Sequence, residues 1–357
     1  MGLDQVPDTM LACQVLEYNK PYVIHEIPTP KNLEPYDMLV KVAVASLCHT
    51  DFLVQEGVFN TKLPCTGSHE GAGTVVAVGS AVKDFKEGDR VMNGLGFHRC
   101  GECEDCTGPE NYVQYCPKNK GSVGVRMDGN FADYVVVDAR NTALLPKEVS
   151  FEIAAPLACA GCTVFRALLQ TELKEGQVVG IVGSGGGLGH LCIQFAKSMG
   201  LKIVAIDARD EGLELSKEHK PDLLLDARKG DAYLVEEVQK FTGKGGVDAS
   251  INLADAPQAA GTACAITKTH GLLVQISQPE PIVIPFKELI FRDIRIKGSR
   301  HCAPVEAKRM LQVAAKNGVT VKTNLFHGLK EIPKMVELSL SGKMAGKGVV
   351  IVDPSQM

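Results

Sequence analysis

Four cysteines lie close together at positions suited to holding a metal ion. Cys100, Cys103, Cys106 and Cys116 are separated by spacers of two, two and nine residues. Thiolates at this spacing can converge on one ion and fill its tetrahedral coordination sphere, which is the arrangement of a structural zinc site. The alternative is a set of free or disulfide-bonded thiols, which the polar residues between these cysteines and their spacing disfavour. The cluster therefore predicts a closed zinc site that takes no part in chemistry.

Three further residues have the types needed for a second zinc site with an open position. Cys48 ends an apolar stretch, His69 opens another, and Cys159 lies in a later apolar segment. Two thiolates and one imidazole leave one position of a zinc ion free, which is the pattern of a catalytic site. The alternative is that the two cysteines only fill space, because free cysteine is among the most buried residue types. Spacing alone does not bring the three residues together.

A glycine-rich run between an apolar stretch and a helical pattern is suited to binding phosphate. Glycines at such a turn let backbone N–H groups approach a pyrophosphate at the start of a helix. The spacing departs from strict G-x-G-x-x-G, so the run alone is a weak signal. It comprises Gly183, Ser184, Gly185, Gly186, Gly187, Leu188 and Gly189.

Asp207 ends the next apolar stretch after the glycine run. A carboxylate there can accept both ribose hydroxyls of adenosine and would repel a 2′-phosphate, which favours NAD over NADP. Arg209 could soften that preference. The alternative is that Asp207 is a turn or helix-capping residue, a common use of aspartate.

Two differently built domains are needed to position these residues. Residues 10–150 contain short β-branched stretches separated by Gly, Pro and Asp, which predicts a compact, mostly antiparallel unit. From Gln177 onward, apolar strands alternate with helical stretches, which predicts a parallel sheet with helices on both faces. After about residue 303 the pattern is irregular, with one predicted helix (304–316) and a closing strand (348–352). The length of 357 residues also suits two domains.

Composition excludes several classes of partner. The net charge is −4 and Trp is absent, so neither a basic field nor a stacking platform for nucleic acid is expected. We see no run of about 20 apolar residues, and therefore expect no membrane span. The start of the chain lacks a secretory signal pattern, and its 12 cysteines then point to a reducing compartment, so we expect a cytoplasmic protein.

Taken together, the motifs resemble those of zinc-dependent medium-chain alcohol dehydrogenases, most nearly the yeast type. The resemblance covers roughly residues 12–353, and its motifs occur in the order of that family. It implies an α/β protein with a GroES-like, mostly-β catalytic domain (1–161 and 303–357) and an NAD-binding Rossmann domain (162–302). The motifs are Cys48-His-Thr-Asp, Gly67-Ser-His-Glu-Gly-Ala-Gly-Thr-Val, the cysteine cluster, Cys159-Ala-Gly-Cys-Thr and the glycine run.

The resemblance also implies roles for individual residues. Asp51 resembles the carboxylate that orients the histidine ligand, Glu70 the glutamate beside the catalytic metal, and Thr50 the hydroxyl that contacts the alcohol. The implied ligands of the catalytic zinc are Cys48, His69 and Cys159, and those of the structural zinc are Cys100, Cys103, Cys106 and Cys116. The implied cofactor residues are His49, Thr163, Ile276, Asp207 and the glycine run.

The implied activity is reversible oxidation of a primary or secondary alcohol to an aldehyde or ketone, with hydride transfer to NAD and two zinc ions per subunit. The family implies a homodimer or homotetramer. Two alternatives stay open: an NADP-dependent aldehyde or enone reductase of the same superfamily, and a non-catalytic zinc-ribbon protein that senses redox state through a dinucleotide.

This sequence departs from the yeast type at several positions. Leu53 stands where the yeast type has a proton-relaying histidine, and Lys347 stands where it has an arginine. Phe59 and Leu95 replace two tryptophans that narrow the substrate pocket, which predicts a substrate bulkier than ethanol. The spacer before Cys116 is also longer, a change that a loop absorbs at little cost.

Overall fold

The computed structural model describes residues 3–108 and 112–357, which form two compact units. The first unit comprises Met1–Cys159, Cys302–Ala315 and Thr323–Met357, and the second comprises Ala160–His301 and Lys316–Lys322. The division expected from the sequence differs from this one chiefly at Lys316–Lys322, a segment that it assigns to the catalytic domain.

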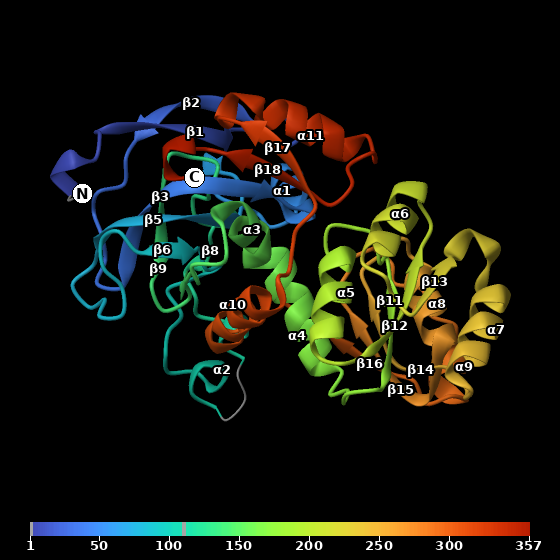
Figure 1. Cartoon of the computed structure of the whole chain (residues 1–357). Coiled ribbons are helices and arrows are strands. Elements are labelled where there is room, and N and C mark those ends of the chain that lie inside the picture. The colour runs from blue at the N-terminus through green and yellow to red at the C-terminus, as the bar shows by residue number, and fades with distance from the viewer. Residues whose placement is uncertain (1–2, 109–111) are drawn as a thin grey trace. The chain divides into compact units, whose positions relative to one another are not determined.

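A seven-stranded sheet is the body of the first unit. Its central strand β3 (Asp37–Leu47) pairs antiparallel with β5 (Glu70–Val78), β9 (Tyr134–Asp138) and β18 (Lys347–Ile351), as Figure 1 shows. The sheet is completed by β6 (Arg90–Met92), β10 (Ala143–Leu144) and β17 (Thr323–His327), of which β17 pairs parallel with β18. The prediction of a compact, mostly antiparallel unit is confirmed.

Smaller sheets and short helices complete the first unit. One sheet has the order β2 (Val23–Pro28), β1 (Thr9–Val15), β4 (Cys65–Thr66), and the other pairs β7 (Gly96–Phe97) with β8 (Gly121–Ser122). The helices are α1 (His49–Gln55), α2 (Glu104–Thr107), α3 (Phe151–Pro156), α10 (Pro304–Asn317) and α11 (Ile332–Leu340), and the 3-10 turns are η1 (Leu3–Gln5), η2 (Val113–Tyr115), η5 (Leu329–Glu331) and η6 (Pro354–Gln356).

Strand β17 and helix α11 are not predicted from the sequence and lie in the region whose pattern is irregular. Strand β17 is only partly buried, so its residues show no clear alternation between apolar and polar positions. Helix α11 buries only Ile332 and Met335, which leaves a narrow apolar face and a weak helical pattern.

The second unit is built on a six-stranded sheet whose strands are all parallel. Its order is β13-β12-β11-β14-β15-β16, which is the order 3-2-1-4-5-6 of a Rossmann fold when β11 is counted as the first strand. The apolar runs of β11 and β14 are buried throughout, as expected of strands covered on both faces. The strands are β11 (Val178–Val182), β12 (Lys202–Asp207), β13 (Leu223–Asp226), β14 (Val247–Asn252), β15 (Thr267–Gln275) and β16 (Arg295–Gly298).

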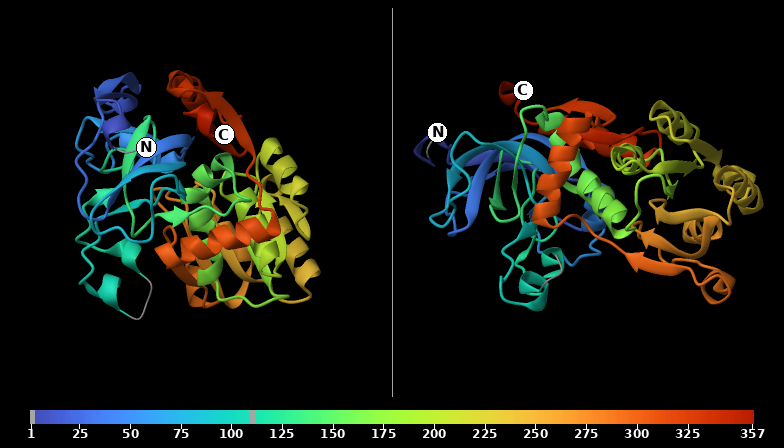
Figure 2. Two further views of the ribbon diagram at one scale, coloured as in Figure 1. Left: turned by 60° about the vertical axis from the view of Figure 1, so that its left-hand side comes forward. Right: turned by 60° about the horizontal axis from the view of Figure 1, so that its bottom comes forward.

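Helices cover both faces of this sheet, as the sequence predicts. Since parallel strands are joined by right-handed crossovers, this strand order places the helices between β11 and β13 on one face and those between β13 and β15 on the other. Figure 2 shows the elements of each unit from two further sides. The helices of this unit are α4 (Cys162–Gln170), α5 (Gly189–Ser198), α6 (Asp210–Glu218), α7 (Asp231–Thr242), α8 (Ala259–Ile266) and α9 (Phe286–Ile290), with a 3-10 turn η4 (Ala227–Lys229).

One helical stretch in the described residues has the length and hydropathy of a membrane span. It is Phe151–Gln170, which the sequence analysis does not single out, and 78% of its apolar window is buried inside the structure. A helix in the interior of a folded domain has the same composition, because its whole circumference contacts other apolar side chains. Its burial makes it weak evidence for a membrane span.

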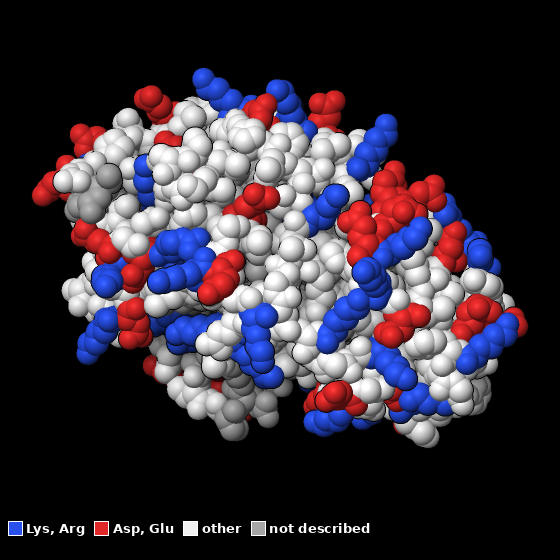
Figure 3. Space-filling view, in the orientation of Figure 1, with Lys and Arg blue, Asp and Glu red and all other residues white. Residues whose placement is uncertain are grey.

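Charged side chains of both signs are interspersed over the face drawn in Figure 3, as expected for a chain with a net charge of −4. Interspersed charges keep a surface hydrated without creating a strong field of one sign.

Candidate active site and metal centres

The first unit brings together the three residues predicted to hold a catalytic metal. Cys48 directly follows β3 and His69 directly precedes β5; these strands are paired with Ser46 opposite Glu70, so their ends are adjacent. Cys159 joins them from a π-helical turn (Leu157–Gly161) that follows α3. Ligand atoms of Cys48, His69, Glu70 and Cys159 all lie within 4.8 Å of one another. This is the spacing at which one ion could bind several of them.

Asp51 fixes the orientation of the His69 ring. Its Oδ1 lies 3.4 Å from Nδ1 of His69, and its Oδ2 accepts a 2.8 Å hydrogen bond from the Cys48 N–H. Both side chains are buried. Both ring nitrogens of His69 are buried and neither makes a hydrogen bond among the described residues, although Nδ1 faces the Asp51 carboxylate. A histidine whose Nδ1 faces a carboxylate presents Nε2 as a ligand, and a metal ion would satisfy this orphaned nitrogen.

Electrostatics at this site also fit a cation. Burial lowers the pKa of His69, but the charges of Asp51 and Cys48 outweigh it and raise that pKa well above the ordinary value. The pKa of Cys48 is well below its ordinary value, chiefly because the Cys159 thiol donates to it, whereas contact with Cys48 and burial raise the pKa of Cys159. Two buried sulfurs in contact ionise together only if a positive charge lies between them.

A buried ion pair lies beside these residues. Nζ of Lys347, the first residue of β18, is 2.7 Å from Oε2 of Glu70, and both side chains are almost fully buried. Burial raises the pKa of Glu70 to about 7, against the opposing effect of Lys347. Lys347 is the position at which the sequence departs from the arginine of the yeast type, and the structure gives it a partner of opposite charge.

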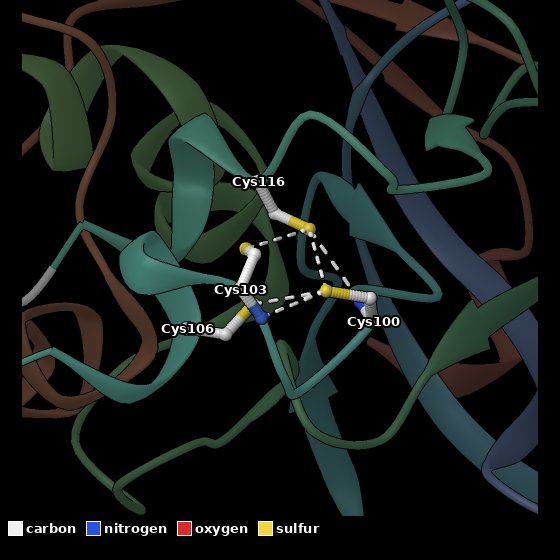
Figure 4. Close-up of side chains that lie close together, drawn as sticks. All are labelled: Cys100, Cys103, Cys106 and Cys116. Atoms are coloured by element: carbon white, nitrogen blue, oxygen red, sulfur yellow. Dashed lines mark hydrogen bonds between the residues drawn. The ribbon is translucent and has the colours of Figure 1, made fainter.

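The four clustered cysteines form a second candidate metal centre, shown in Figure 4. The sulfur of Cys116 lies 3.6 Å from that of Cys100 and 3.8 Å from that of Cys103, and the sulfurs of Cys100 and Cys106 are 4.0 Å apart. Zn–S bonds of about 2.3 Å in a tetrahedron require sulfurs about 3.8 Å apart, whereas a disulfide requires about 2.05 Å. The spacing therefore fits a closed zinc site and excludes disulfides.

Backbone N–H groups point at the sulfurs of this cluster. Those of Glu102 and Cys103 donate to Cys100 Sγ at 3.5 and 3.4 Å, and they lower the pKa of Cys100 to about 6. Thiolates are the form that binds zinc. Cys103 and Cys106 belong to the turn of α2, and Cys116 follows η2; residues 109–111 of the intervening spacer lie outside the described part of the chain.

The glycine run forms the turn between β11 and α5 in the second unit. Gly183 has φ +83°, and a Cβ on Gly185 would lie 1.8 Å from the carbonyl oxygen of Gly212 at α6, so both positions require glycine. The run ends where α5 begins, at Gly189. It therefore lies at the carboxyl end of β11, next to β14, where strand order reverses and open α/β sheets bind ligands.

Asp207 is held tightly at the end of β12. Its Oδ2 accepts the Gly185 N–H at 2.8 Å, and its Oδ1 accepts the N–H groups of Ala208 and Arg209 at 2.9 and 3.1 Å. Asp207 therefore also acts as a turn residue, the alternative considered for it, because its side chain accepts the N–H groups of the turn that follows. The same bonds fix its carboxylate beside the glycine run, as a ribose-binding role requires.

The remaining predicted site residues are divided between the two units. His49 and Thr50 begin α1, directly after Cys48. Thr163 lies in α4 of the second unit, and Ile276 follows β15 with its N–H donating to Asn252 at 3.1 Å.

Buried residues that have no sequence signal hold the backbone before His69. Ser68 has φ +68° and donates through Oγ toward Ser46 O or Glu70 O, at 2.9 and 3.0 Å. Nδ2 of Asn130 donates to Ser68 O at 3.1 Å, and Asn93 donates to Oδ1 of Asn130 at 2.7 Å. All of these side chains are buried. No spacing rule points to them; the positive φ of Ser68 is visible only in the structure.

Comparison with known proteins agrees with this architecture. Residues 34–147 match the family described as alcohol dehydrogenase GroES-like domain, and residues 187–316 match the family described as zinc-binding dehydrogenase. Alcohol dehydrogenase 1 of Emericella nidulans is 35% identical, over 96% of this chain and 98% of the relative. An alcohol dehydrogenase of Geobacillus stearothermophilus is 33% identical, over 96% of this chain and 100% of the relative.

A solved structure has the same fold. The alcohol dehydrogenase of the hyperthermophilic archaeon Aeropyrum pernix superposes with a TM-score of 0.85 at 29% identity, covering 96% of this chain and 99% of that one. With curated relatives above 30% identity along almost its whole length, the chain belongs to the zinc-binding medium-chain alcohol dehydrogenase family.

Proposed function

We propose that this protein is a zinc- and NAD-dependent alcohol dehydrogenase that reversibly oxidises a primary or secondary alcohol to an aldehyde or ketone. The observation that carries the proposal is the convergence of Cys48, His69 and Cys159, with Nε2 of His69 buried and unsatisfied. Three protein ligands around one ion leave a position for substrate.

Each neighbouring residue then has a definite task. Bound at Cys48, His69 and Cys159, zinc would supply a Lewis acid that polarises the alcohol hydroxyl, and NAD would supply the hydride acceptor. Asp51 keeps the His69 ring in place, and the Thr50 hydroxyl accepts the proton of the alcohol while it passes its own proton on toward solvent. Leu53, one turn further along α1, cannot carry that proton to water, so its release takes a route that avoids position 53.

The metal assignment is tested by counting zinc in purified variants. We expect two zinc ions per wild-type subunit, because the two ligand clusters are separate. Cys159→Ser should retain one zinc and lose alcohol-dependent NADH production, while its fold is preserved by circular dichroism. Cys162→Ser, at a buried cysteine outside both clusters, is the matched control. A Cys159→Ser protein with full activity would refute the proposal.

The preference for NAD is supported by the fixed carboxylate of Asp207. We expect kcat/KM with NAD to exceed that with NADP. Asp207 also bonds the Gly185 N–H, so Asp207→Asn, which keeps an acceptor, is the variant to use. Asp207→Asn should lower the ratio of kcat/KM with NAD to kcat/KM with NADP. A wild-type preference for NADP would favour the reductase alternative.

A substrate larger than ethanol is supported by Phe59 and Leu95, which take the places of two tryptophans. A panel of short and long, primary and secondary alcohols tests this, with NADH absorbance as the readout. We expect kcat/KM to rise from ethanol to larger alcohols, and ethanol as the best substrate would contradict the idea. Production of NADH with any alcohol would also exclude the non-catalytic zinc-ribbon alternative.

We further propose that the protein is a homodimer or homotetramer in the cytoplasm. The side chains of Phe286, Ile290 and Phe291 are 70–74% exposed and lie near β16, an edge strand that pairs with β15. Since an aromatic side chain offers about 150–250 Å², the two phenylalanines of this patch expose on the order of 300 Å² per copy, more than a third of the roughly 800 Å² per partner in a standard interface.

Light scattering checks the assembly: the Phe291→Glu variant should have a smaller mass than the wild type, and a monomeric wild type would refute it. A reducing compartment is supported by the 12 cysteines of the chain, six of which belong to the two candidate metal centres.

A further inference from the structure

The glycine run has a connection to the rest of its unit that the proposed function does not use. Segment Lys316–Lys322, here called the arm, belongs to the second unit although the chain on both sides of it belongs to the first. Val319 in the arm is buried, whereas Thr320 and Lys322 are exposed. Side chains of α5, the helix that follows the glycine run, hold the arm in place.

The side-chain amide of Gln194, in α5, makes two hydrogen bonds to the arm, here called the clamp. Its Nε2 donates to Thr320 O at 2.9 Å, and its Oε1 accepts the Thr320 N–H at 2.9 Å. Both backbone groups of one residue are thus satisfied by one amide, which fixes the arm on the surface of α5.

His190, one turn earlier on α5, joins the arm to the glycine run. Its Nε2 accepts the Lys322 N–H at 3.2 Å, and its Nδ1 lies 3.0 Å from Gly186 O. A backbone N–H can only donate and a carbonyl can only accept, so the ring must be neutral with its proton on Nδ1. The imidazole is fully buried, and a single rigid ring therefore contacts both segments.

We propose that His190 is a positioning residue that couples the docking of the arm to the conformation of the glycine run, and hence to dinucleotide affinity. The link to affinity rests on the proposed function; the coupling between arm and run does not. When the arm is held by Gln194, the Lys322 N–H holds the ring, and the ring holds Gly186 O. When the arm is released, the ring loses the Lys322 N–H, and Gly186 O, which also accepts the His190 N–H at 3.3 Å, is held less rigidly.

The test uses Gln194→Ala, which removes the clamp on the arm without touching the glycine run. Hydrogen–deuterium exchange of the full chain should become faster in the arm and also in residues 183–189. The dissociation constant for NADH, from fluorescence titration, should rise about fivefold, the low end of typical coupling between sites. Gln239→Ala, at an exposed glutamine of α7 in the same unit, is the matched control and should change neither quantity.

A second variant separates coupling from simple loss of stability. His190→Asn keeps a donor toward Gly186 O, but its shorter side chain cannot reach the Lys322 N–H. Residues 183–189 should stay more protected in His190→Asn than in His190→Ala. In the His190→Asn background, Gln194→Ala should produce no further change in residues 183–189 or in the NADH constant.

Two outcomes would overturn the inference. One is faster exchange in the arm of Gln194→Ala with residues 183–189 and NADH binding unchanged; the other is an equal effect of Gln194→Ala with and without His190. If the wild type binds neither NADH nor NADPH, the proposed cofactor is wrong, and the exchange measurements alone then decide whether the arm and the glycine run are coupled.

Discussion

The backbone of Ser68 is strained, and the hydrogen bonds around it offset that strain. A non-glycine residue at φ +68° is strained by on the order of 1 kcal/mol. Its N–H donates to Asp51 at 3.1 Å, its Oγ bonds backbone oxygens, and its own carbonyl accepts from Asn130. These bonds hold the peptide before His69 in one conformation. The geometry of the candidate catalytic metal site is thus fixed by residues that do not touch the ion.

Asn130→Ala should weaken metal retention at one site. It leaves the buried Nδ2 of Asn93 without its acceptor and removes a bond to Ser68 O, which should lower the free energy of unfolding by about 1–3 kcal/mol. One zinc should be lost to a chelator faster than in the wild type, with a parallel loss of activity. Asn141→Ala, whose amide bonds Gly96 O instead, should leave that rate unchanged. Equal chelation rates for Asn130→Ala and the wild type would show that this network does not position His69.

Asp248 gives the second unit a pH-dependent stability. Burial favours its protonated form, but hydrogen bonds from Lys244, Lys268 and the Val178 N–H outweigh burial and lower its pKa from 3.8 to about 2. The folded state thus binds this proton more weakly than the unfolded state. The stabilisation is complete above the ordinary pKa and is lost as the pH falls from about 4 toward 2.

Asp248→Asn should lower the free energy of unfolding at neutral pH by about 1–3 kcal/mol, because two lysines lose their partner. The difference from the wild type should shrink as the pH falls below about 4, where the wild-type carboxylate also takes up a proton. Urea unfolding at a series of pH values measures both. Asp255→Asn, at an exposed position, is the control; a difference for Asp248→Asn that is independent of pH would contradict this explanation.

At the scale of elements, the π-helical turn Leu157–Gly161 decides where Cys159 points. Pro156 has no N–H, so regular helical bonding is interrupted just before the turn. A π turn accommodates an extra residue in a helix and often occurs at functional sites. Here it interrupts the helical stretch Phe151–Gln170 at the ligand.

Deleting Ala158 should rotate Cys159 away from Cys48 by roughly the 100° that one helical residue spans. We expect this variant to fold with one zinc per subunit and to lack activity. Deleting Glu280, an exposed residue in the loop between β15 and α9, is a control that shortens the chain without affecting either cysteine cluster. If the Ala158 deletion retained two zinc ions, the turn would not be what directs the ligand.

How much could be predicted from the sequence differs between the elements. The second unit was predictable because its central strands β11, β12 and β14 are apolar runs buried almost throughout, and helical stretches alternate with them. The cysteine cluster was predictable because its ligands are neighbours in sequence. That Cys48, His69 and Cys159 lie together could be predicted only from the resemblance to a known family. Strand pairing and a helical irregularity make them adjacent, and neither is visible in their spacing. Ser68, Asn130 and the arm had no sequence signal, because backbone conformation and distant hydrogen bonds define them.

At the scale of the whole molecule, loss of the metal ion from one centre should leave the other centre occupied. Cys103→Ser removes a ligand from a site with no open position, so it should lower the melting temperature and the zinc content by one ion. Activity at low temperature should persist in the fraction that stays folded. Cys13→Ser, at a buried cysteine outside both clusters, is the control. A Cys103→Ser protein with one zinc fewer and an unchanged melting temperature would show that this ion does not stabilise the fold.

The pairing of β18 with β3 sets an order of events during synthesis. Ser46 and Gly348, which hydrogen-bond to each other, are 302 residues apart, and Lys347 reaches Glu70 from the same late strand. The cysteine cluster, whose four ligands leave the ribosome together, can capture its ion while translation continues. The three ligands of the other centre have emerged by residue 159, but β3 lacks its partner β18 and Glu70 lacks Lys347 until nearly the whole polypeptide has been made. We therefore expect its thiols to be less protected from oxidation and from competing metals until the last strand has docked.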